Sequence, residues 1–144
     1  MIDAFTGDYR FLSNFYPHPL TYEGVLYPTA EHAYQAQKTL HQSEREMIAK
    51  LRSPGLAKKA GKLLVLRPDW DRVKVQVMRE ILTEKFKSHH LRKQLSYTAG
   101  QTIVEGNYWH DNYWGMCRCE NCANTVSDNY LGKLLMEIRG DGRV

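Results

Sequence analysis

The segment Asp69–Phe86, DWDRVKVQVMREILTEKF, carries the clearest structural pattern in this chain. Its apolar side chains recur every three or four positions, which is the period of an α-helix that buries one face. Asp69 stands immediately before this stripe and is a candidate N-terminal cap. The stripe consists of Trp70, Val73, Val77, Met78, Ile81, Leu82 and Phe86. We therefore expect the longest helix of the molecule here.

Upstream of this segment the sequence predicts three shorter helices. Thr29 can cap a helix that runs from residue 30 to about residue 40, because a threonine hydroxyl accepts from the first backbone N–H groups. Ser43 has a glutamate three positions later, which is the pattern of a capping box. Ser53 is followed by proline, which suits the first turn of a helix.

Downstream, leucines at positions 91 and 95 predict a further short helix. A last apolar stripe precedes Gly140, which can end a helix because glycine accepts a left-handed backbone. The stripe is Leu131, Leu134, Leu135 and Ile138. Helix therefore dominates the predicted fold.

The predicted β-structure is small. Leu20–Tyr22 and Val25–Tyr27 alternate around Glu23-Gly24, which indicates a hairpin, and Thr102–Glu105 predicts one short extended segment. Residues 105–128 show neither period and predict a structured functional loop. The predicted fold class is mainly α, or α+β with minor β: one compact helical domain over residues 1–144, with a short N-terminal hairpin and a structured aromatic loop.

Length and composition limit the class of protein. With 144 residues, 42% hydrophobic and 25% charged, the chain can bury a core without disulfides. No apolar run is long enough to span a bilayer, and the N-terminus has no export signal, so we expect a cytoplasmic protein and no membrane partner. The net charge of +4 favours an anionic partner, either a phosphate-bearing ligand or nucleic acid.

Glu31, Gln35 and Lys38 are spaced by four and three positions, so on a helix they share one face. A carboxylate, an amide and an amine on one face could serve catalysis. The alternative is that Glu31 complements the helix dipole and that Lys38 is simply solvated.

Aromatic and polar residues gather in Glu105–Gly115, EGNYWHDNYWG, and again in Phe11–Pro17, FLSNFYP, which includes Asn14. Aromatic walls with carboxylates and amides suit a sugar or base pocket. Trp109 and Trp114 could equally cover the core from a loop.

The cysteines, Cys117, Cys119 and Cys122, follow the pattern C-x-C-x-x-C. We expect reduced, free cysteines and no cofactor. A structural zinc is the alternative, and it needs a fourth ligand, for which His110 or a more distant histidine is available.

Five strings, in order along nearly the whole chain, resemble the NADAR family, also called YbiA-like. They are Phe11–Phe15, Glu31–Lys38, Trp70 with Val77-Met78, Asp111–Gly115 and Leu131–Met136. The resemblance implies a mostly helical N-glycosidase. It implies active-site roles for Glu31, Trp70, Asp111 and Trp114, with Lys38 as a covalent nucleophile.

The resemblance also implies two substrates, each with a ribose C1 bonded to nitrogen: ADP-ribosylated guanine in DNA or nucleosides, and phosphoribosylamino-pyrimidine intermediates of riboflavin biosynthesis. The basic charge favours the first. We expect Glu31, Lys38 and Asp111 to be catalytic, and Trp70, Trp114, Asn14 and Gln35 to bind substrate. Direct attack by water is the alternative to a lysine Schiff base. A non-catalytic module that recognises ADP-ribose or nucleic acid is the alternative from another class.

Overall fold

The computed structural model describes residues 1–142, so the last two positions of the predicted domain, 143 and 144, lie outside the described residues. The chain divides into two compact units. One unit is Asn14–Ser88, and the other joins Met1–Ser13 to the chain from His89 onward. That residues 1–144 form a single domain stays a prediction.

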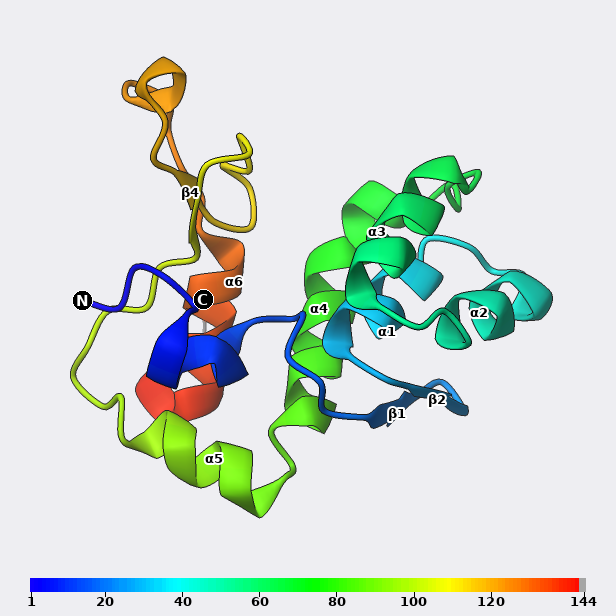
Figure 1. Ribbon diagram of the computed structural model, residues 1–144, viewed down its shortest axis with the longest axis horizontal. Coiled ribbons are helices and arrows are strands. Elements are labelled where there is room, and N and C mark those ends of the chain that lie inside the picture. The colour runs from blue at the N-terminus through cyan, green and yellow to red at the C-terminus, as the bar shows by residue number, and fades with distance from the viewer. Residues whose placement is uncertain (143–144) are drawn as a thin grey trace. The chain divides into compact units, whose positions relative to one another are not determined.

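The central unit, Asn14–Ser88, contains four helices: α1 (Ala30–Ala36), α2 (Gln42–Ala49), α3 (Pro54–Leu63) and α4 (Trp70–Lys85). The helix α4 is the longest, as its periodicity predicted, and it buries the apolar stripe read from the sequence except Val73, which is half-buried. The short helix α1 packs against α2, α3 and α4 (Figure 1). All seven residues of α1 are buried, so the unit is built around this helix.

The predicted hairpin is present as β1 (Leu20–Tyr22) and β2 (Val25–Tyr27), paired antiparallel. The turn places Glu23 at φ 50° and Gly24 at φ 78°, and glycine reaches such a left-handed backbone without steric cost. The Tyr22 hydroxyl donates to Glu80 Oε1 at 2.7 Å, which ties the hairpin to α4.

The N-terminus of α1 is fixed by a buried network around His32. The Thr29 hydroxyl accepts from the His32 backbone N–H at 3.2 Å, as expected of a cap, and lies 2.7 Å from His32 Nδ1. His32 Nε2 lies 2.8 Å from the carbonyl oxygen of Leu51. Burial lowers the pKa of His32, which favours a neutral ring that donates to Leu51 and accepts from Thr29.

Three helix ends differ from the predictions. The helix α1 ends at Ala36 rather than near Leu40, because the N–H groups of Gln37 and Lys38 bond to carbonyls three residues back, which tightens the last turn. The cap of α2 is His41 rather than Ser43. Asp69 occupies the cap position of α4, but its carboxylate pairs with Arg67 at 2.6 Å instead of capping.

The other unit combines both ends of the chain. It contains the 3₁₀ helices η1 (Gly7–Leu12) and η2 (Glu120–Cys122), the helices α5 (His89–Ser96) and α6 (Tyr130–Met136), and the π-helical turn η3 (Glu137–Asp141). Its strands β3 (Gly106–Asn107) and β4 (Met116–Cys117) pair in parallel. Ile2 forms a parallel bridge with Ile103, in the segment predicted to be extended.

The mainly α fold class with minor β is confirmed. Among the described residues, no helix has both the length and the apolar character that crossing a bilayer requires.

Candidate active site

Glu31 lies in the first turn of α1, and its side chain is buried, with 8% of its surface exposed. Gln35, one turn later, donates from Nε2 to Glu31 Oε2 at 2.6 Å. The Glu31 backbone N–H donates to the carbonyl of Asn14 at 3.0 Å, which joins the aromatic-polar segment to the start of the helix. A buried carboxylate held by an amide has a fixed direction, as acid–base chemistry requires.

Gln35 is held on its other side by α3. A Cβ atom added to Gly61 would lie 1.9 Å from Gln35 Oε1, so only glycine leaves room for this amide. The oxygen itself has no hydrogen-bond partner among the described residues. Gln35 is therefore held between Glu31 and α3, and its predicted role in substrate binding stays a prediction.

Lys38 lies in the tightened turn after α1 and is half-buried. Its backbone carbonyl accepts from the Arg67 N–H at 2.8 Å, which fixes the turn. Burial lowers the pKa of Lys38, the negative charge of Glu31 acts in the opposite direction, and Lys62, Lys58 and Lys74 lower it further. A lowered pKa increases the share of neutral amine, the form that attacks carbon.

One aromatic ring stands beside Lys38, and a second ring packs against the first. Its Nζ lies 5.9 Å from the centroid of the Tyr34 ring, and the Tyr34 and Trp70 rings are 5.3 Å apart. Trp70 is only 5% exposed.

Asn14 is also buried, and its Nδ2 contacts Met78 Sδ at 3.4 Å, while its Oδ1 has no hydrogen-bond partner among the described residues. That acceptor is available to a ligand hydroxyl or N–H group.

The structure thus gathers Asn14, Glu31, Gln35, Lys38 and Trp70 in the central unit. Asp111 and Trp114 belong to the other unit. The roles of all seven residues remain predictions.

Asp111 shapes the loop in which it lies. Its Oδ1 accepts from the backbone N–H groups of Tyr113 at 3.1 Å and Trp114 at 2.9 Å, which holds the carboxylate in one orientation. The Trp114 ring packs edge-on against Tyr113, with centroids 5.0 Å apart, and lies 6.3 Å from Tyr130. The aromatic loop is therefore structured, as predicted.

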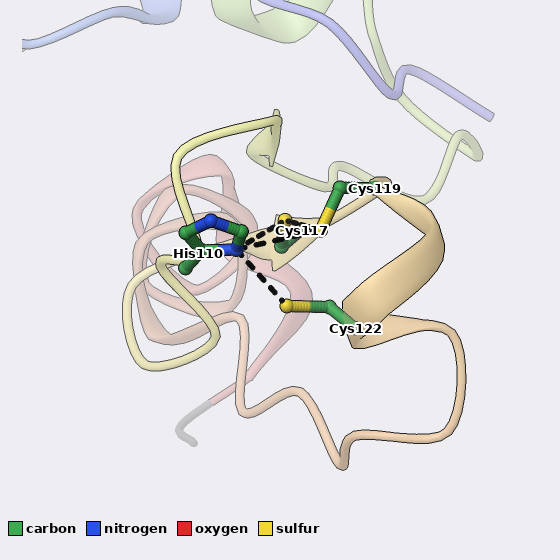
Figure 2. Close-up of side chains that lie close together, drawn as sticks. All are labelled: His110, Cys117, Cys119 and Cys122. Carbon is green, nitrogen blue, oxygen red and sulfur yellow. Dashed lines mark hydrogen bonds between the residues drawn. The ribbon is translucent and has the colours of Figure 1, made fainter.

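A possible metal-binding cluster lies in the same unit. It consists of His110, Cys117, Cys119 and Cys122, which the close-up in Figure 2 draws together. The three cysteines are free, as expected, and His110 supplies the fourth donor that the sequence left open.

Comparison with known proteins identifies the family. A family model described as the NADAR domain matches residues 4–141. The chain belongs to the NADAR family. The NADAR match extends over residues of both units.

Curated relatives of this NADAR chain include N-glycosidases. It is 41% identical to N-glycosidase YbiA of Escherichia coli over 137 residues, which cover 93% of this chain and 82% of that protein. It is 36% identical to an N-glycosidase of Nostoc punctiforme over 141 residues, with 94% and 86% covered. On this evidence the NADAR chain is an enzyme, a hydrolase acting on N-glycosyl bonds.

Two further similarities concern structure and context. The NMR structure of the E. coli protein YbiA matches with a TM-score of 0.81 and 38% identity, covering 98% of this NADAR chain and 84% of that chain. A riboflavin biosynthesis protein of Vibrio vulnificus is 33% identical over 134 residues, which cover 92% of this chain but 35% of that protein.

Sequence reasoning missed two residues beside the site. Tyr34 stands four positions before Lys38, and that spacing was the available signal. Gly61 is a glycine inside a helix, which commonly marks a close packing contact, but no pattern in the sequence indicates its partner.

Proposed function

We propose that this chain hydrolyses the ribosyl C–N bond that joins ADP-ribose to guanine in modified DNA or nucleosides. The observation that carries the proposal is the buried Glu31 carboxylate, bonded to Gln35 at 2.6 Å, near enough to the partly desolvated amine of Lys38 to affect its pKa. An acid–base group and a nucleophile in one unit are the parts that cleavage at a ribose C1 needs.

The reaction separates charge in a defined direction. As the C1–N bond breaks, positive charge develops on C1 and the ring oxygen, and negative charge develops on the departing base. Glu31 in its acid form protonates the base, and its carboxylate form then stabilises the cationic sugar. Gln35 keeps this side chain in place throughout.

In the covalent route, the neutral amine of Lys38 forms a bond to C1 as the bond to the base breaks, and the amine then loses a proton. The ring oxygen takes up a proton as the C1–O bond of the ribose ring opens, which gives a protonated Schiff base between Lys38 and the sugar and a free hydroxyl on the sugar. Water adds to C1 and expels the amine, and the released aldehyde closes to free ADP-ribose. In the alternative route, Glu31 assists water that attacks C1 directly.

The remaining predicted residues receive roles in binding. Asp111, whose orientation is fixed by two backbone N–H groups, is assigned to a ribose hydroxyl or to the cationic transition state. Trp70 and Trp114 are assigned to packing on base or ribose. The unpartnered acceptor of Asn14 is assigned to a substrate donor. None of these roles requires a cofactor.

The charges around Lys38 support a substrate with more than one phosphate. Lys58 and Lys62 on α3 and Lys74 on α4 are all near enough to affect its pKa. Such a positive field attracts the diphosphate of ADP-ribose, and a DNA strand adds further negative charge. The same field fits the expected anionic partner. That partner and the cytoplasmic location stay proposals.

A second candidate substrate is a phosphoribosylamino-pyrimidine. The observation in its favour is that a segment similar to this chain occurs within riboflavin biosynthesis proteins of Vibrio vulnificus and Zea mays. This substrate also presents a ribose C1 bonded to nitrogen, so the same side chains apply. A recognition module that binds ADP-ribose without cleaving it is the competing function from another class.

The test is a parallel hydrolysis assay with guanine-ADP-ribosylated DNA and with the phosphoribosylamino-pyrimidine. Free ADP-ribose and restored DNA are followed for the first substrate, and free pyrimidine and free ribose phosphate for the second. The proteins compared are the wild type, Glu31→Gln and Glu46→Gln, an exposed control on α2. We expect release of free ADP-ribose from the first substrate, a loss of about 100-fold or more in kcat for Glu31→Gln, and little change in the control.

If only the phosphoribosylamino-pyrimidine is hydrolysed, that compound rather than ADP-ribosylated guanine is the substrate of the enzyme. Binding of ADP-ribose with no product from either substrate would overturn the catalytic proposal. Borohydride trapping separates the two routes, because only the Schiff base leaves a reduced sugar adduct on Lys38.

A further inference from the structure

His110, Cys117, Cys119 and Cys122 turn their donor atoms toward one another (Figure 2). The four donor atoms all lie within 4.8 Å of one another. His110 Nδ1 lies 3.4 Å from Sγ of both Cys119 and Cys122 and 3.8 Å from Sγ of Cys117. The Sγ atoms of Cys117 and Cys119 are 3.3 Å apart.

These separations can be compared with the edges of a zinc coordination tetrahedron. Zn–S bonds of about 2.3 Å and Zn–N bonds of about 2.0–2.1 Å place sulfurs about 3.8 Å apart and a nitrogen about 3.5 Å from each sulfur. The four distances given above lie within about 0.5 Å of these edges, and the two between Cys122 Sγ and the other sulfurs are at most 4.8 Å. A disulfide needs about 2.05 Å between sulfurs, so Cys117 and Cys119 are not bonded.

We propose that this cluster is a structural Cys₃His zinc site. Three thiolates and one imidazole are the donor set that selects zinc over magnesium or calcium, which prefer oxygen. Four protein ligands complete a tetrahedron and leave no position for water or substrate, so the site is structural rather than catalytic. Binding displaces the thiol protons of the cysteines into solvent.

The site joins three segments of this unit that follow one another in the sequence. His110 lies in the loop between β3 and β4, and Cys117 belongs to β4. Cys119 is the N-cap of the short η2, and Cys122 is its last residue. His110 has φ 68°, a left-handed backbone that is unfavourable for a residue with a side chain. A metal ligand at this position holds the backbone there and closes the loop.

The loop so closed contains Asp111 and Trp114, between His110 and Cys117. Asn112 adds a second tie, because its Oδ1 accepts from the Cys117 N–H at 2.9 Å and from the Ser127 hydroxyl at 3.0 Å. If Asp111 and Trp114 act as in the proposed function, zinc fixes their positions. The metal site itself does not depend on that function.

The first test is the metal content of the full chain, produced in zinc-supplemented medium, dialysed against metal-free buffer and analysed by inductively coupled plasma mass spectrometry. We expect about one zinc ion per chain. After exchange of zinc for cobalt, we expect the intense visible bands of tetrahedral Co²⁺ and a sulfur-to-cobalt charge-transfer band in the near ultraviolet.

Cys119→Ser and His110→Asn should lose the bound zinc, whereas His90→Asn, an exposed histidine of α5 in the same unit, should retain it. If a variant fails to fold, the cobalt spectrum of the wild type still shows whether the four side chains bind a metal ion in tetrahedral geometry. A chain that folds, carries no zinc and gives a six-coordinate or absent cobalt spectrum overturns the proposal.

Hydrogen exchange separates this proposal from the catalytic one. Chelation of zinc should raise the exchange rates of amides in residues 107–127 and leave those of α4 unchanged. That result supports the metal site even if neither substrate is hydrolysed. Unchanged exchange in residues 107–127 after the zinc has been removed overturns the structural role.

Discussion

The chemistry of Lys38 depends on the protonation of one amine. The amine is half-buried in a turn, and burial lowers its pKa while Glu31 raises it. At a pH below the usual lysine value, Lys38 therefore carries more of the neutral form than a solvated lysine. Its reactivity toward an aldehyde should increase with pH through a midpoint below 10.5, the ordinary pKa of a lysine amine.

This midpoint can be measured by reductive methylation with formaldehyde and borohydride, followed by peptide mass spectrometry at a series of pH values. Glu31→Gln removes the negative charge that favours the ammonium form, so the midpoint of Lys38 should move to lower pH in this variant. The exposed Lys50 serves as the internal control and should not respond to the substitution. A midpoint for Lys38 at or above 10.5 would contradict the prediction.

Single residues also show what the sequence could and could not predict about the site. The spacing of Glu31 and Gln35 indicated a shared helix face, and the two side chains are hydrogen-bonded. The same spacing argument for Lys38 assumed that the helix continues, yet Lys38 lies in the tightened turn beyond α1. Helix ends depend on tertiary partners, here the Arg67 N–H, and local propensity does not include them.

At the scale of elements, the contact between α1 and α3 depends on Gly61. Alanine is the better helix former by about 1 kcal/mol, but a Cβ at this position would overlap the Gln35 side chain. Displacing Gln35 breaks its bond to Glu31, so Gly61→Ala should cost roughly 1–3 kcal/mol of unfolding free energy and lower kcat as well.

Gly55→Ala, in the first turn of the same helix, is the matched control. The nearest atom to an added Cβ there is Ser53 Oγ at 3.9 Å, an ordinary contact. Urea unfolding and steady-state turnover should show loss for Gly61→Ala and near-wild-type values for Gly55→Ala. Equal behaviour of the two variants would contradict the packing argument.

The elements themselves were largely predictable, because periodicity reports which face is buried. The apolar stripe predicted α4, and the two leucines predicted α5. Glu23-Gly24 predicted the turn of the hairpin. The cap of α4 was not predictable in the same way. Asp69 has the right residue type and position, but its carboxylate pairs with Arg67, two residues before it.

At the scale of the whole molecule, the unit that contains the metal cluster is assembled from both ends of the chain. The Ile2 N–H donates to the Thr102 carbonyl, and the Val104 N–H donates to the Ile2 carbonyl, each at 2.8 Å. Asp3 also pairs with Arg118 at 3.1 Å. Nothing in the first residues predicted this partner, because a single bridge about a hundred residues away leaves no periodic pattern.

Ile2 is 3% exposed, so Ile2→Ala should destabilise the protein by roughly 2–5 kcal/mol. Leu26→Ala, in the hairpin, removes a side chain that is 64% exposed and should change the stability little. Chemical unfolding followed by far-ultraviolet circular dichroism measures both. An Ile2→Ala variant as stable as Leu26→Ala would show that the N-terminal bridge contributes little.

The overlap between a Cβ at position 61 and the amide at position 35 also has an evolutionary consequence. The two positions are 26 apart in sequence and share one volume, so selection acts on them together. In descendants of this chain, we expect a larger residue at 61 to appear only after position 35 has shortened. A library that randomises both positions at once should return functional pairs that are absent from libraries of either position alone.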